Sequence, residues 1–291
     1  MSAADLPTRR NESWKYSDLR GALAGQAPPM AGEGAVIERL AAGAGCFETR
    51  LIGAGERDIV VEYLDADAFA PRAESVTVGE GGAYHRIVLQ LGGDVALSHC
   101  RVRLGKGASF RQFVFAEGAR LARVETVVEA KGEGAEIELN GAYLAAAGRH
   151  ADLTSTIELS GPDGVARQLI KGVARKGGRG VFQGKIVVER AAQKTDARQH
   201  HHGMLLEDGA EIFAKPELMI YADDVQCAHG NTAGGLDAQA LFYLRSRGVP
   251  ETEARALLIE AFLLDTLPDW APPNVREEID RRIRAWLRAA A

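Results

Sequence analysis

The sequence predicts a mainly β protein made of many short strands, followed by a helical region at the C-terminus. Runs rich in Val, Ile, Leu and aromatic residues recur along the middle of the chain, and most are bounded by glycine-containing turns, as is typical of strands. The turns also repeat: Gly-Ala-Glu-Ile occurs at 134–137 and at 209–212, and the similar turns at 105–108 and 132–135 start 27 residues apart. Such a period indicates stacked repeats. We therefore expect a parallel β-helix (solenoid), in which each repeat pairs with the next; an antiparallel sandwich with strands of similar length is the alternative.

The expected domains follow from shifts in composition. Residues 1–58 contain charged sequence, a Pro-Pro pair and Gly/Ala-rich turns, so we expect an irregular, partly helical N-terminal segment. Residues 59–235 hold the strand-like runs and form the expected β-helix core. Residues 236–291 change to helical spacing. The expected strands are Ile59–Leu64, Tyr84–Leu91, Phe110–Phe115, Val124–Ala130, Ile137–Leu144, Leu153–Leu159, Val181–Val188 and Ile212–Tyr221.

Three helices are expected after the core: residues 236–247, residues 251–267, and a third that begins near Asn274. A Gly-Val-Pro sequence at 248–250 ends the first helix. Asn274 and the glutamate three residues later predict a capping box for the third. The apolar stripes of these helices predict packing against the sheet, with docking of a partner by one of them as the alternative. The stripe residues are Leu241 and Leu244 in the first helix, Leu257, Leu258, Ala261, Phe262 and Leu264 in the second, and Val275, Ile279, Ile283, Trp286 and Leu287 in the third.

Composition and charge argue against several classes of function. Lys plus Arg number 35 against 40 Asp plus Glu, the net charge is -5, and there is no long basic run, so nucleic acid is not expected as a partner. The N-terminus lacks the apolar stretch of a secretory signal. The longest apolar run, Ala256 to Leu264, is interrupted by Glu260 and is shorter than the ~20 residues of a membrane span. We therefore expect a cytoplasmic protein without membrane association.

The three cysteines argue against a resident metal centre. Cys46, Cys100 and Cys227 lie far apart without a Cys-x-x-Cys motif, which is neither a disulfide framework nor a closed zinc site. An iron–sulfur cluster normally takes four ligands. We expect a reducing compartment and no tightly bound cofactor, and any cluster would need ligands from a second chain.

A histidine run offers a second candidate for metal binding. In a strand, His200 and His202 share a face about 7 Å apart, while His201 points the other way. At most the first two can therefore join one metal, and no third ligand lies nearby in sequence. A self-contained metal protein is one interpretation of this run, and a polar strand face is the simpler alternative.

Two adjacent carboxylates suggest a different class of protein. Asp223 and Asp224 resemble the acid pair of a β-helix enzyme acting on carbohydrate. Neighbours in a strand face opposite ways, however, so a turn or edge pair is the simpler interpretation. The glycine-rich tract at 176–180 lacks the pattern of a phosphate-binding loop, so any ATP that is used is expected to be hydrolysed elsewhere.

Cys227 and His229 form the most informative pair. At positions i and i+2 of an extended chain their side chains project to one face, and a thiolate with an imidazole suits iron, copper or zinc. A buried cysteine and a hydrogen-bonded histidine without ligands are the alternative. The sequence around the pair shifts the balance between the two interpretations.

The segment from Lys194 to Gly248 closely resembles the SufB/SufD family of iron–sulfur cluster assembly proteins. Within that family it is similar to the SufD branch, because Cys-x-His-Gly stands where the SufB branch has His-Glu-Ala-Thr. The N-terminal Trp14-Lys-Tyr-Ser-Asp-Leu19 also matches a SufD-like signature. The matching motifs are Lys194-Thr-Asp196, Gln199, Leu205-Leu206, Lys215-Pro-Glu-Leu218, Ile220-Tyr-Ala-Asp-Asp-Val225, Cys227-Ala-His-Gly230, Thr232, Leu236-Asp237 and Phe242-Tyr-Leu-Arg-Ser-Arg-Gly248.

The resemblance implies a right-handed parallel β-helix flanked by helices and a non-catalytic scaffold subunit. Such a subunit pairs with SufB and binds the ATPase SufC, with a homodimer as an alternative when it is isolated. The resemblance also implies that His229, with Cys227 beside it, takes part in assembling a transient iron or nascent cluster shared with SufB. The expected SufC-binding residues lie between about 238 and 267, and are Leu241, Phe242, Tyr243, Arg245, Arg247, Leu258 and Phe262.

Two features depart from the family pattern. The N-terminal region before the strands is short, and the run His200 to His202 replaces residues that are mostly uncharged and polar in the family. The function of the N-terminal segment and of the histidine run therefore does not follow from the resemblance.

Overall fold

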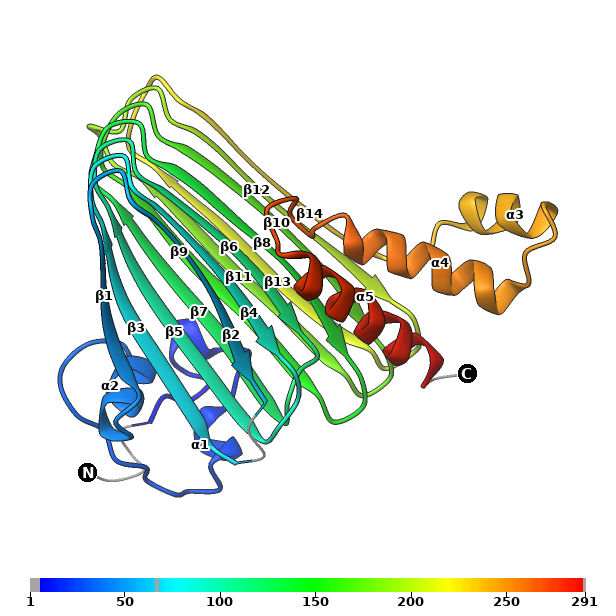
Figure 1. The fold of residues 1–291 in the computed structure, drawn as a ribbon. Helices are drawn as coiled ribbons and strands as arrows, with labels where there is room; N and C mark the ends of the chain where they lie inside the picture. The colour runs from blue at the N-terminus through cyan, green and yellow to red at the C-terminus, as the bar shows by residue number, and fades with distance from the viewer. Residues whose placement is uncertain (1–5, 66–67, 290–291) are drawn as a thin grey trace.

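The chain folds into a parallel β-solenoid whose successive strands alternate between two facing seven-stranded sheets (Figure 1). The computed structural model describes residues 6–65 and 68–289. All pairings between the named strands are parallel, so the expected β-helix is confirmed and the antiparallel sandwich is wrong. In spatial order, sheet A contains β1 (Phe47–Ile52), β3 (Ala70–Val78), β5 (Val95–Leu104), β7 (Leu121–Ala130), β9 (His150–Leu159), β11 (Arg179–Val188) and β13 (Glu211–Ile220). Sheet B contains β2 (Arg57–Leu64), β4 (Ala83–Gln90), β6 (Ser109–Ala116), β8 (Glu136–Ala145), β10 (Val165–Ala174), β12 (Asp196–Leu205) and β14 (Gln226–Gly234).

Each of the eight expected runs corresponds to a strand, but the sequence did not predict β1, β3, β5, β10, β12 and β14. The first strand begins at Phe47, within the segment expected to be irregular. In β1 the residues in register with the inward-facing side of β3 include Glu48 and Arg50, so charge hides the alternation that marks a half-buried strand.

The interior between the sheets is mainly apolar. One cluster of fully buried side chains includes Val102, Phe110 and Ile157, and a second includes Val114, Tyr143 and Phe182. Removing such surface from water is worth about 25 cal/mol per Å², and it is the main force that holds the two sheets together. A row of buried polar side chains lies between these clusters, and it leads to the functional site described below.

Stacked turns join each strand of sheet A to the next strand of sheet B. One residue in each of six successive turns has a positive φ, and its N–H donates to a carbonyl of the next turn at 2.7–2.9 Å. Glycine occupies the first four of these positions, because it adopts positive φ without a steric cost. The last two are Asp163 and Lys194, with φ of 59° and 65°. The repetition seen in the sequence is therefore a stack of equivalent turns.

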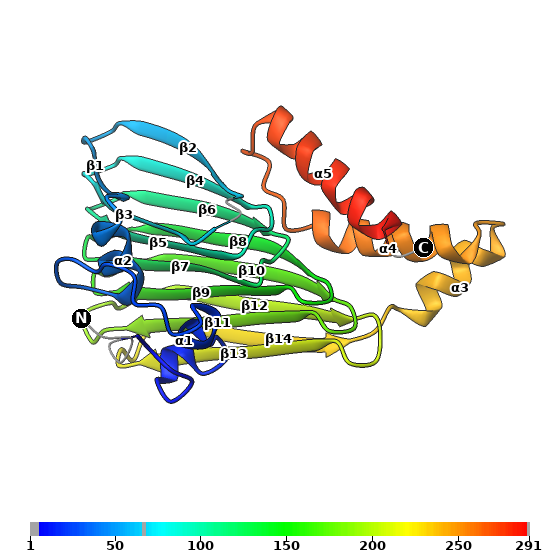
Figure 2. The same ribbon diagram turned by 90° about the horizontal axis from the view of Figure 1, so that it is seen from below.

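Two of the three C-terminal helices cover the outer face of sheet B (Figure 2). These are α4 (Glu251–Leu264) and α5 (Pro273–Arg288), which bury Ile259, Leu263 and Ile279 against residues of β4, β6 and β8. The expected stripe of the second helix is partly wrong, since Leu257 and Ala261 are exposed. The first helix, α3 (Ala238–Ser246), buries no residue and projects away from the solenoid (Figures 1 and 2).

The expected capping box of the third helix is wrong. Helix α5 begins one residue earlier than expected, with Pro272 as its N-cap and Pro273 in its first turn, and no side chain caps it. Proline is favoured in a first turn because its fixed φ suits the helix and no N–H is lost. Asn274 therefore lies inside the helix, where its side chain cannot accept the capping hydrogen bond.

The N-terminal segment crosses the outer face of sheet A. It contains the short 3₁₀ helix η2 (Glu12–Trp14) and the helices α1 (Leu19–Ala22) and α2 (Val36–Gly43). Trp14 is buried with the guanidinium of Arg123 4.3 Å from its ring centroid, and Tyr16 stacks on Phe213 at 5.1 Å. Since Arg123 lies on β7 and Phe213 on β13, this segment ties together distant turns of the solenoid.

The helices give no sign of a membrane span: within 6–65 and 68–289, none combines the length and the apolar character that crossing a bilayer requires.

Candidate functional site

The candidate site lies on the last strand pair of the solenoid. Strands β13 and β14 end their sheets, and among the described residues neither pairs with a further strand. Most residues of β14 are exposed, and those of β13 are half-buried or exposed. This end, which we call the β13–β14 end, therefore presents both side chains and unpaired backbone edges.

Cys227 and His229 project to the same face of β14, as expected from their spacing. They are in register with Ala197 and Gln199 of β12, whose side chains are fully buried in the interior. Cys227 is half-buried and packs against the interior apolar cluster. Burial raises the pKa of the Cys227 thiol, although a backbone hydrogen bond partly opposes this. His229 is exposed, so its imidazole is the more accessible of the two groups.

His200 and His202 lie on the opposite, outward face of β12. Their rings are stacked with centroids 6.2 Å apart, and His202 Nδ1 contacts Thr232 Oγ1 at 2.7 Å. Burial lowers the pKa of His202, and the nearby Lys171 lowers it further. Within the described residues, no cluster of three His, Cys, Asp or Glu side chains has the geometry of a metal site. The histidine pair therefore has no third ligand in the part of the chain that the structure covers.

The middle histidine of the run is a buried structural residue. His201 points into the interior, where its Nε2 lies 2.9 Å from the hydroxyl of Tyr143 and its Nδ1 2.7 Å from Asn231 Oδ1. Its ring also stacks on Phe182 at 5.1 Å. Burial lowers the pKa of His201 to about 4, so the ring is neutral at pH 7.

Asp223 and Asp224 occupy the exposed turn between β13 and β14. The carboxylate of Asp224 pairs with Lys194 Nζ, and its backbone N–H donates to Gln193 Oε1 at 3.0 Å. These contacts match the structural interpretation of the acid pair. They give no support to a carbohydrate-active enzyme.

The expected ATPase-binding residues divide into exposed and partly covered groups. Phe242 and Tyr243 of α3 are 74% and 58% exposed, unusually high fractions for aromatic side chains. Arg245 pairs with Glu251, and the guanidinium of Arg247 lies over the Tyr243 ring. Leu241, Leu258 and Phe262 are half-buried, and Phe262 packs beside Lys171 of β10.

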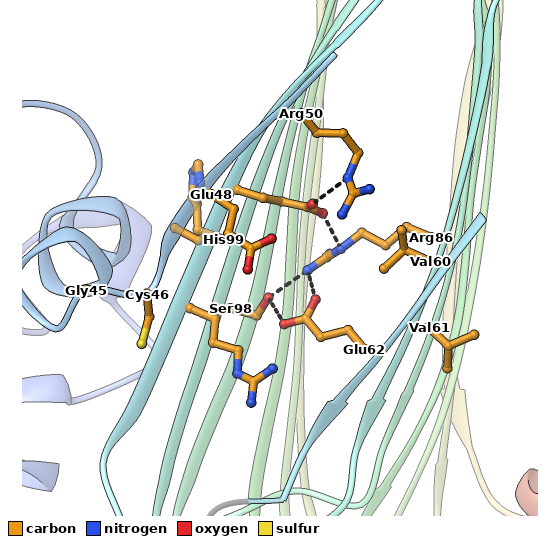
Figure 3. A pocket seen from close by; sticks show the side chains of 13 residues that line it. Gly45, Cys46, Glu48, Arg50, Val60, Val61, Glu62, Arg86, Ser98 and His99 are labelled. Atoms are coloured by element: carbon orange, nitrogen blue, oxygen red, sulfur yellow. Dashed lines mark hydrogen bonds and ion pairs between the residues drawn. The ribbon is translucent and has the colours of Figure 1, made fainter. Parts of the chain in front are cut away.

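A pocket that the sequence did not predict opens at the opposite end of the solenoid, between β1 and β2 (Figure 3). It has a volume of about 360 Å³. At its base the buried Arg86 donates to Glu62 at 2.5 Å and to Ser98 at 2.7 Å. Its Nε also lies 2.9 Å from Glu74 Oε1, an ion pair whose angle is outside hydrogen-bond geometry. The buried cation of this pocket, the guanidinium of Arg86, is therefore already paired with carboxylates of the same chain.

A Ser-His-Asp cluster under the N-terminal segment does not have the geometry of a catalytic triad. The Ser17 hydroxyl donates to Asp152 at 2.5 Å and also lies 3.0 Å from His150 Nε2. In a triad the histidine stands between the other two groups and takes the serine proton. Here the proton goes to the aspartate, and Ser17 is fully buried, so the cluster anchors the N-terminal segment.

Comparison with known proteins agrees with this architecture. Residues 41–262 match the family model described as SUF system FeS cluster assembly, SufBD core domain. The iron–sulfur cluster assembly protein SufD of Escherichia coli is 28% identical over 79% of this chain and 56% of its own length. A SufBD family protein of Mycobacterium tuberculosis is 29% identical over 87% of this chain and 64% of its own length. A third relative, from Synechocystis, is 39% identical over 56% of this chain and 37% of its own length.

The aligned regions therefore span between about a third and two thirds of these relatives. The family match nevertheless covers every named strand of the solenoid together with α3 and nearly all of α4. It thus contains both the β13–β14 end and the exposed helix beside it. This chain belongs to the SufBD family of iron–sulfur cluster assembly proteins, and SufD is among its relatives.

Proposed function

We propose that this chain is the SufD-like scaffold subunit of a SufBCD-type complex that assembles iron–sulfur clusters. It pairs with a SufB-like subunit through the β13–β14 end and contributes no catalytic residue of its own. The observation that carries this proposal is the presence of Cys227 and His229 on one face of an edge strand that is open to a partner. The iron or nascent cluster is cargo shared between the two subunits rather than a resident cofactor.

His229 is the better placed of the two ligands. It is exposed, and a neutral imidazole binds iron without first losing a proton. Cys227 is half-buried with a raised thiol pKa, so little of it is thiolate at neutral pH and it requires a change of environment before it binds metal. We expect His229 to contribute first and Cys227 only after the interface has moved.

Exposed apolar side chains at the β13–β14 end favour pairing there. Met219, Ile220 and Tyr221 are 39%, 42% and 51% exposed, and the adjoining backbone edges pair with no strand in the part of the chain that the structure describes. A partner that covers these side chains gains the burial of apolar surface. The same partner surrounds His229, which places additional ligands within reach of its ring.

Helix α3 is the proposed binding element for a SufC-like ATPase. Its aromatic pair is exposed, it buries no residue, and it packs mainly against the neighbouring helix α4, so a partner can move it without disturbing the solenoid core. Because α3 follows β14 closely along the chain, movement of the helix can reach the β13–β14 end. Hydrolysis of ATP is assigned to the partner.

Substitution of His229 tests the site. In a complex reconstituted with SufB-like and SufC-like partners, we expect His229→Ala to slow cluster assembly by at least tenfold, as loss of a metal ligand should. His200→Ala is the matched control, because His200 lies on the outward face of the neighbouring strand. Assembly is followed by the visible absorption of the cluster. An intact His229→Ala complex with the assembly rate of the parent would contradict the site.

Substitution of the aromatic pair tests the ATPase surface. We expect the double variant Phe242→Ala/Tyr243→Ala to weaken binding of a SufC-like ATPase by about 30-fold or more, since buried aromatic anchors typically contribute at least 2 kcal/mol. Leu51→Ala is the control, because Leu51 is 75% exposed at the opposite end of the solenoid. Titration calorimetry measures both. Equal effects of the two changes on binding would show that α3 is not part of the ATPase interface.

A further inference from the structure

A ladder of buried amide side chains ends directly beneath His229. Gln199 Nε2 donates to Gln168 Oε1 at 2.9 Å, and Gln168 Nε2 donates to Ser155 Oγ at 2.8 Å. Because its amide nitrogen is engaged with Gln168, the Oε1 of Gln199 is the free atom at the end of the ladder. This oxygen is buried and accepts no hydrogen bond from the residues that the structure describes. Leaving such an acceptor unpaired costs about 1–3 kcal/mol.

The position of Gln199 is fixed by the facing sheet. Gly184 of β11 lies against the Gln199 side chain, and a Cβ at this glycine would come within 2.3 Å of Gln199 Nε2. Gln199 itself is fully buried. The missing side chain at position 184 thus provides the space that the amide fills, and the amide cannot turn freely to find another partner.

Two contacts on the same strand pair show how the free oxygen can be satisfied. His201 and Asn231 are in register between β12 and β14, as are His202 and Thr232. In both pairs an imidazole Nδ1 on one strand lies 2.7 Å from a side-chain oxygen on the other. Gln199 and His229 form a third in-register pair, with the imidazole now on β14 and the oxygen on β12.

We propose that Gln199 is a positioning residue for His229, whose ring turns from its orientation in the structure so that its Nδ1–H donates to Gln199 Oε1. This contact pairs the buried oxygen and holds His229 as the Nδ1–H tautomer, so that the lone pair of Nε2 faces the open end of the solenoid. The function of this arrangement rests on the role proposed above for His229 in binding iron or a nascent cluster. Histidines that bind metals usually donate their other ring N–H to a carbonyl or carboxylate, which orients the ring.

The tautomer of His229 tests this contact without any metal. In the full chain labelled with ¹⁵N-histidine, the ring nitrogen shifts report which nitrogen carries the proton, and the signal that disappears in His229→Ala assigns the residue among the seven histidines. We expect the Nδ1–H form in the parent chain. Gln199→Leu should convert His229 mainly to the Nε2–H form.

Two further variants separate positioning from packing. Gln168→Leu removes the amide one strand deeper and leaves the Gln199 oxygen in place, so His229 should keep the Nδ1–H tautomer. Gln199→Glu retains an acceptor, and the Gln168 amide can turn to donate to it while accepting from Ser155, so this variant should also keep the Nδ1–H form. An Nε2–H tautomer in the parent chain, or equal effects of the two leucine variants, would overturn the proposal.

The rate of cluster assembly tests whether positioning of His229 by Gln199 matters for function. Loss of a residue that orients a metal ligand typically costs 10–100-fold, so we expect Gln199→Leu to slow assembly by about tenfold and Gln199→Glu to restore most of the rate. Should His229→Ala leave assembly unchanged, the proposed function fails while the tautomer result still decides whether Gln199 positions the ring. Should the tautomer prediction fail while His229→Ala is inactive, only the role of Gln199 is lost.

Discussion

The buried polar side chains at the two ends of the solenoid differ in whether they are paired. At the β1–β2 end, the buried guanidinium of Arg86 is surrounded by Glu62, Glu74 and Ser98. At the β13–β14 end, the buried oxygen of Gln199 has no hydrogen-bond partner among the described residues, and His229 is exposed above it. Both ends interrupt an apolar interior with polar groups, but at the first end the buried charge of Arg86 is neutralised by carboxylates of the chain, whereas at the second end the Gln199 oxygen accepts no hydrogen bond from the described residues.

This difference agrees with the pairing that we propose at the β13–β14 end. Buried polar groups in folded proteins are nearly always paired, so a buried charge that is neutralised within the chain requires no further partner. The oxygen of Gln199 instead lies in register with the exposed His229, the side chain that we propose it orients. A choice of functional site based only on the number of ionisable residues would have favoured the β1–β2 pocket, which has more of them.

The largest expected effect on stability is at the β1–β2 end. Arg86→Ala leaves the carboxylates of Glu62 and Glu74 without their buried cation, and breaking a buried ion pair in this way typically costs 3–5 kcal/mol. Urea unfolding followed by circular dichroism measures the change in the free energy of unfolding. His229→Ala is the comparison at the β13–β14 end, where an exposed substitution should remain within about 0.5 kcal/mol. Similar losses for both variants would refute the distinction between the two ends.

The next effect concerns pH and belongs to the β13–β14 end. The pKa of His201 is about 4 in the folded chain and about 6.5 when unfolded, so folding favours the neutral ring. The resulting stability is present above pH 6.5 and is lost as the pH falls towards 4, by on the order of 3 kcal/mol. Unfolding free energies of the parent chain and of His201→Asn, compared at pH 7 and pH 4.5, isolate this contribution.

The comparison with His201→Asn is needed because His150 titrates in the same range. Burial also lowers the pKa of His150 to about 4, so the parent chain loses stability through both residues. We expect the variant to lose less stability than the parent between the two pH values. Identical pH dependence of the two proteins would show that His201 is not protonated on unfolding in this range.

The smallest effect distinguishes the turns near the two ends. Gly107 has a φ of 60° and no atom near the position of a Cβ, so Gly107→Ala costs about 1 kcal/mol through backbone strain alone. Lys194 already has a φ of 65° with a side chain. Lys194→Ala keeps that strain and removes only an exposed ion pair, which is worth at most about 1 kcal/mol and often nothing. Thermal unfolding that ranks Lys194→Ala as clearly more harmful would contradict this account.

The sequence predicts the apolar part of this architecture and misses the polar part. Strands such as β6 and β11 were recognised because apolar residues dominate them, whereas β12 presents Gln199 and His201 to the interior. Hydrophobic periodicity cannot identify a strand whose buried face is polar. The spacing of Cys227 and His229 did predict that they share a face, because that depends only on the two-residue period of a strand.

Local sequence patterns also could not predict the contacts between distant segments. The signature around Trp14 was recognised as a motif, but its packing on Arg123 and the hydrogen bond from Ser17 to Asp152 join residues more than a hundred positions apart. The amide ladder is similar, since each member comes from a different strand. These features depend on the order in which the turns stack, and that order cannot be predicted from a short stretch of sequence.

The stacked turns give the solenoid a direction. Each N–H in the stack donates toward the β13–β14 end, from Gly55 through to Lys194, which donates to the carbonyl of Asp224. In the final turn the N–H of Asp224 donates to the side chain of Gln193 instead, so the chain caps its own stack. The donor of the final turn at this corner is therefore already engaged, and it offers no hydrogen bond to the turns of a second solenoid. Head-to-head association must therefore use the strand edges and their side chains, and the polarity of the turns disfavours joining two solenoids into one continuous stack.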